Sequence, residues 1–67
     1  MFDTRLTFWN RKRKLLVVDH RGRNAAKIEI DACKSRIRRG EGTHIEIEAI
    51  SSDGAEYIDE LREFARG

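Results

Sequence analysis

The sequence predicts an α+β fold in which two helices cover one face of a three-stranded mixed sheet, in the order β-β-α-β-α. Apolar and polar residues alternate along 43–50, which is typical of a strand, whereas apolar residues in 54–66 recur at helical spacing. The segment 4–19 is rich in β-branched and aromatic residues and is interrupted by a basic cluster, which indicates a hairpin. A chain of 67 residues has room for one such domain.

The hairpin joins an alternating strand to an apolar one. In the first strand Leu6 and Phe8 share one side, and Trp9 lies on the other. The second strand contains the unbroken apolar run 15–18, which is typical of a central strand. Because a helix connects the second strand to the third, we expect those two strands to be parallel, with the first added antiparallel at an edge.

The segment 25–32 fits either a helix or a strand. As a strand, it alternates apolar and charged residues as far as Ala32. As a helix over about 25–38, it places Ala26, Ile30, Cys33 and Ile37 on one apolar stripe. The stripe is longer than the alternation, so the helix is favoured.

Turn and capping residues bound the two helices. Asn24 is a candidate cap for the first helix, and Gly40 or Gly42 ends it. Ser52 or Asp53 is expected to cap the helix over 54–66.

With both helices on one face, the other face of the sheet is expected to be open. It offers Arg5, Trp9 and one side of 15–18 to a partner. The sequence therefore allows a homodimer or a docked protein, either on the open face or by strand addition at the edge formed by 4–9.

Charge is distributed unequally along the chain. Residues 1–40 contain twelve Lys and Arg and four acids, whereas residues 41–67 contain two Arg and eight acids. The net charge of +2 therefore conceals a basic part that suits a polyanion and an acidic part that repels one. Two solvated surfaces, with no binding role, are the plain alternative.

The basic residues are the best candidates for a binding site. Those at the hairpin tip and at the end of the first helix are expected to neutralise phosphates, while Trp9 stacks on a base. A secondary basic turn contains Arg21 and Arg23. The predicted nucleic-acid-binding residues are Trp9, Arg11, Lys12, Arg13, Lys14, Arg36, Arg38 and Arg39.

Other chemistry has little support in the sequence. Cys33 lies on the apolar stripe, which favours a core position over a catalytic one. His20 follows Asp19 at a strand end, but no third catalytic partner accompanies them. One cysteine and two separated histidines make a poor zinc site, and no run is long enough to span a membrane. We expect a non-catalytic cytoplasmic protein without cofactor or metal.

Two family resemblances involve the residues around His20. The run Asp19-His20-Arg21-Gly22, a helix, and Gly42 before a strand resemble the sulfur-carrier TusA/SirA family over about two-thirds of the chain. Ala25 and Ala26 occupy the positions of that family's reactive Cys-Pro. The resemblance implies a β-α-β-α build and, if another residue replaces the thiol, sulfur transfer.

The part from Gly42 to Leu61 is similar to the end of the phosphocarrier HPr, and 20–26 is similar to its His-x-Arg-Pro-Ala-Ala motif. This resemblance implies the same build and a phosphoryl carrier acting through His20.

Our first prediction is a small module that binds nucleic acid through phosphates. The alternatives are a regulatory module for an acidic protein partner, and a degenerate carrier using Cys33 or His20.

Overall fold

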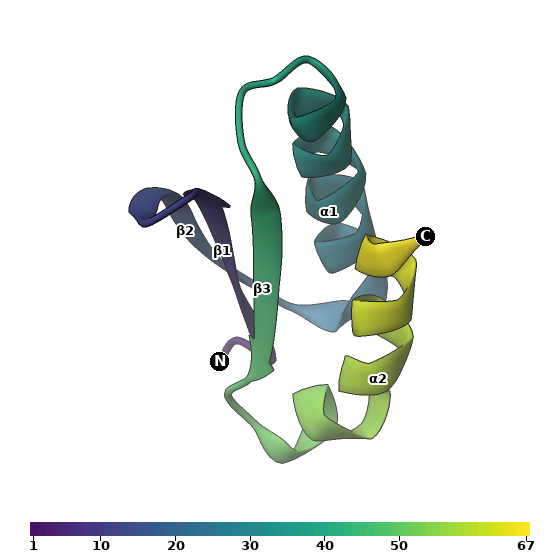
Figure 1. Ribbon diagram of the computed structural model, residues 1–67. Coiled ribbons are helices and arrows are strands. Elements are labelled where there is room, and N and C mark those ends of the chain that lie inside the picture. Colours follow the sequence, from purple (N-terminus) through teal and green to yellow (C-terminus); the bar gives the residue numbers. More distant parts are fainter.

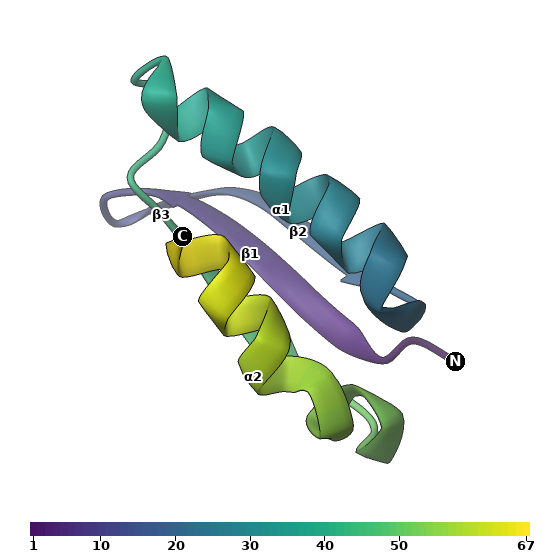
Figure 2. The same ribbon diagram turned by 90° about the vertical axis from the view of Figure 1, so that its right-hand side faces the viewer.

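The computed structural model describes residues 1–67 and contains five elements in the predicted β-β-α-β-α order. They are β1 (Thr4–Asn10), β2 (Arg13–His20), α1 (Gly22–Arg38), β3 (His44–Ala49) and α2 (Ser52–Arg66). Both helices lie on one face of the sheet, and the other face is open (Figure 1 and Figure 2). The α+β class and the two-layer arrangement are confirmed.

The sheet differs from the prediction in strand order and direction. Its order is β2-β1-β3, and β1 is antiparallel to both neighbours. The expected mixed sheet is therefore wrong, and so is the placement of 4–9 at an edge, because β1 is paired on both sides. The apolar run of β2 belongs to an edge strand: Leu16 and Val18 face the helices, while Val17 is half exposed on the open face.

The core forms between β1 and the two helices. Thr4, Leu6 and Phe8 face the helices from β1 and are almost fully buried. Ala26, Ile30 and Cys33 cover them from α1, and Tyr57, Ile58 and Leu61 from α2. The predicted stripe of α1 is confirmed, so the strand interpretation of 25–32 is wrong.

The helix ends depend on residues that are distant in sequence. α1 begins at Gly22 and its first amide donates to Asp3 Oδ2 at 2.8 Å, so Asn24 is not the cap. At the other end Gly40 adopts the left-handed φ of 80°, as predicted for the residue that ends α1. α2 is capped by Ser51, whose hydroxyl accepts from the Gly54 amide at 3.2 Å, and not by Ser52 or Asp53.

No helix has the length and the apolar character that crossing a bilayer requires.

Candidate nucleic-acid interface

The hairpin tip is fixed against the loop that follows α1. Arg11 occupies the two-residue turn with a left-handed φ of 58°, and its amide donates to Thr43 Oγ1 at 2.7 Å. The Thr43 amide in turn donates to the Trp9 carbonyl at 2.8 Å. These bonds place the tip at the same end of the molecule as the last turn of α1, away from the N-terminus (Figure 1).

The four cations of the tip have no acidic partners. The side chains of Arg11, Lys12, Arg13 and Lys14 are exposed, and none of them forms an ion pair. A left-handed backbone costs a residue with a side chain about 1–3 kcal/mol, so arginine is a costly choice for this turn. The turn and the first two residues of β2 therefore present four charges that no acidic side chain compensates.

An aromatic pair lies beside these cations on the open face of the sheet. Trp9 of β1 and His44 of β3 are direct neighbours across the strands, and their rings are stacked at 5.9 Å with an interplanar angle of 4°. The Lys14 ammonium lies over the Trp9 ring at 5.4 Å from its centre. Trp9 Nε1 is buried without a hydrogen-bond partner. The Trp9 ring therefore lies next to the basic tip, between His44 and the Lys14 ammonium.

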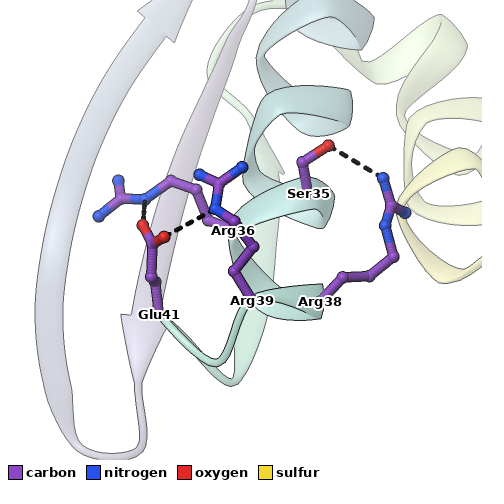
Figure 3. Close-up of polar contacts among 5 residues, drawn as sticks. All are labelled: Ser35, Arg36, Arg38, Arg39 and Glu41. Atoms are coloured by element: carbon purple, nitrogen blue, oxygen red, sulfur yellow. Dashed lines mark hydrogen bonds and ion pairs between the residues drawn. The ribbon is translucent and has the colours of Figure 1, made fainter.

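The end of α1 contributes two arginines that are already paired. Arg36 and Arg39 both bond to Glu41, at 3.1 and 2.7 Å, and Figure 3 shows them converging on that carboxylate. Arg36 also lies 4.9 Å from the centre of the Phe8 ring. Hydrogen bonds from Arg39 first, and then from Arg36, lower the pKa of Glu41. Glu41 is therefore ionised at neutral pH and offsets one of the two charges.

Arg38 lies apart from this pair. It donates to Ser35 Oγ at 2.9 Å, on the side of α1 away from Glu41 (Figure 3). We define the basic end as the surface formed by Arg11, Lys12, Arg13, Lys14, Arg36 and Arg39, next to Trp9 and His44. Seven of the eight predicted binding residues belong to this surface or adjoin it, and Arg38 points elsewhere.

The secondary basic turn lies at the other end of the molecule. Arg21 covers the Phe2 ring at 5.7 Å, and Arg23 lies over the Tyr57 ring at 5.2 Å. Arg23 also bonds to Glu60 at 3.1 Å. This turn therefore does not join the basic end within one molecule, and one of its two cations serves the packing of α1 against α2.

The acidic residues of the open face begin beside the aromatic pair, where a Glu46 oxygen lies 3.9 Å from His44 Nε2. Arg5 holds Asp19 in a bidentate pair, with its two bonds at 2.8 and 3.1 Å, and Glu46 and Glu48 of β3 are exposed. A polyanion on this face would meet attraction at the hairpin tip and repulsion near Glu46 and Glu48. The acidic residues of β3 therefore oppose a polyanion over the part of the open face that lies beyond the tip.

Cys33 and His20 are both enclosed by the fold. Cys33 is 1% exposed, and burial first, then Glu29, raises the pKa of its thiol. The His20 side chain is 11% exposed, with Nε2 3.5 Å from a Glu29 oxygen. Cys33 therefore occupies the core position that its apolar stripe predicts.

Sequence reasoning missed His44 and Thr43. The alternation along 43–50 places His44 on the outer face, but only the pairing of β3 with β1 brings it to Trp9.

Comparison with family models, with curated proteins and with solved structures finds no match for this chain. The likeness to the TusA/SirA and HPr families therefore stays a prediction from sequence.

Proposed function

We propose that this protein binds nucleic acid at the basic end, through phosphate neutralisation and without reading sequence. The observation that carries the proposal is the set of four exposed cations, without ion pairs, on the fixed turn and the first two residues of β2. Phosphate contacts of this kind release condensed counterions, and this release supplies most of the affinity of non-specific binding. Catalysis, a metal and a cofactor have no part in this mechanism.

The aromatic pair adds a second contact. A base that stacks on Trp9 replaces the Lys14 ammonium over the ring, and that ammonium then becomes available to a phosphate. His44, on the adjacent strand, stacks on the Trp9 ring and supports it from the other side. The single-stranded form suits this arrangement because its bases are free to leave a stack.

An acidic protein is the second candidate partner, because the same four cations would serve it. A partner strand cannot pair with 4–9, as the sequence predicted, because this segment is the central strand and has no free edge. A carrier role for Cys33 or His20 has no comparable support, because Cys33 is buried and the His20 side chain is only 11% exposed.

The test compares how affinity falls with salt in three proteins. We expect R11A/K12A/R13A to bind a labelled oligonucleotide more weakly, with a salt slope smaller by about three, because each lost phosphate contact removes about one unit. Fluorescence anisotropy at several salt concentrations measures both quantities. R11K/R13K retains the charge and is the matched control.

An unchanged slope in R11A/K12A/R13A would place the binding elsewhere. Loss of slope in R11K/R13K would show that guanidinium geometry, and not charge, drives the contact.

A further inference from the structure

The two edges of the sheet differ in how well they are covered. At the β3 edge, Arg62 of α2 donates from Nε to the Ile47 carbonyl at 3.2 Å, so a side chain occupies one of the strand's outward groups. His44, Glu46 and Glu48 give the outer face of that strand three polar side chains. Coverage and charge of this kind discourage strand addition.

The β2 edge has no such cover. No side chain bonds to its backbone from outside the sheet, and Leu15 and Val17 are 37% and 49% exposed. A strand edge with exposed apolar side chains is a template for pairing with another strand. β2 is therefore the edge that is open to a partner.

When two copies of β2 run antiparallel, the apolar residues of one copy lie opposite those of the other. A two-fold axis at Val17 pairs Val17 with its own copy on the open face, and Leu16 with Val18 on the helix face. Apolar residues thus meet at the centre of the paired strands.

The helix above β2 leaves room for a second copy. Glu29 contacts His20, so this flank of α1 faces β2. Ala25 and Ala32 lie on the same flank, four and three residues from Glu29, and both are exposed. Small side chains there allow the two α1 helices to approach as the sheets join.

We propose that a second copy of this chain pairs with β2, forming a two-fold dimer with a continuous six-stranded sheet. In this dimer the hairpin tip of one copy lies beside the secondary turn, Arg21 and Arg23, of its partner. The two basic clusters that are separate in one molecule then form one surface. This last consequence rests on the proposed function, whereas the pairing itself does not.

The first experiment measures the mass of the protein over about a hundredfold range of concentration, without nucleic acid. We expect a dimer that persists or strengthens as salt rises, because like charges from the tip and the turn approach each other. V17K is expected to be monomeric, and I50K, which adds the same charge at an exposed residue outside the sheet, to remain dimeric. Circular dichroism confirms that each variant is folded.

A second variant tests the register. The Cα atoms of directly opposed residues lie about 4.5 to 5.5 Å apart, within reach of a disulfide. V17C is therefore expected to form a covalent dimer under mild oxidation, while I50C is not, and native Cys33 does not compete because it is buried. Three results would each overturn the proposal: a monomer at every concentration, an association that dissolves with salt, or V17C that crosslinks no better than I50C.

Discussion

At the scale of single residues, Asp3 joins three segments of the chain. Its carboxylate accepts hydrogen bonds from the Gly22 amide at 2.8 Å, the Tyr57 hydroxyl at 3.0 Å and the Ser51 hydroxyl at 3.2 Å. Its backbone bonds to His20 and Ile50. One residue near the N-terminus thus ties the starts of both helices to the sheet. No local pattern predicts this role, because every partner is distant in sequence.

Asp3 should make stability depend on pH. The Gly22 amide first, and then the Tyr57 hydroxyl, lower the pKa of its carboxyl in the folded state. Its contribution is therefore present above the unfolded pKa of about 4, and is lost as pH falls through the folded value. We expect D3N to lower the Tm at neutral pH and to weaken the loss of stability in acid.

Thermal melts at a series of pH values measure both effects. D31N removes an exposed carboxylate that accepts no hydrogen bond and is the control. A D3N curve parallel to that of the wild type would contradict the account.

Gly54 allows α2 to approach the N-terminal segment. A Cβ at this position would lie 1.9 Å from the Asp3 carbonyl oxygen, although alanine normally stabilises a helix relative to glycine. We expect G54A to lower the free energy of unfolding by about 1–3 kcal/mol, because the segment around Asp3 has to shift. Urea unfolding measures the loss, with S52A in the same turn as control. A G54A protein as stable as the wild type would show that the approach is not required.

At the scale of elements, helix faces are easier to predict than strand order. The apolar spacing of α1 and α2 selects their buried faces because each helix needs only one apolar stripe. Sheet order depends on pairings between distant segments, and the apolar run 15–18 indicates a central strand when it belongs to an edge. The edge position explains why Val17 is exposed, and the proposed dimer would cover it.

Glu41 lowers the positive charge that the end of α1 presents. Because Arg36 and Arg39 both bond to it, E41Q should free them for phosphate and raise affinity for an oligonucleotide by about tenfold at low salt. The salt slope should also steepen. Anisotropy titrations measure the change, and E63Q, the same charge change beside Arg66 on α2, is the control. Equal affinities for E41Q and E63Q would show that net charge, and not the basic end, sets the affinity.

At the scale of the whole molecule, some basic residues of 1–40 form ion pairs with acidic residues of 41–67. Lys27 and Arg23 of α1 pair with Glu60 of α2 at 2.6 and 3.1 Å, so the basic and acidic parts of the chain hold the helices together. The hydrogen bond from Lys27 first, and then the charge of Arg23, lower the pKa of Glu60. The four cations of the hairpin tip form no ion pair, and the same holds for Arg21, Lys34 and Arg38.

The candidate site is predictable in part from the sequence. The basic tip and Trp9 are adjacent in the chain, so their proximity needs only a hairpin. The pairing of Arg36 and Arg39 with Glu41 and the stacking of His44 on Trp9 depend on how the loop after α1 returns to the sheet. Composition therefore identifies the cations, and the fold decides which of them remain free.

The fluorescence of Trp9 tests the central claim most directly, because it is the only tryptophan and lies beside the basic tip. Titration with a single-stranded oligonucleotide at low salt should change its emission until the site is saturated, and added salt should reverse the change. Emission that stays constant throughout a low-salt titration would contradict binding at the basic end.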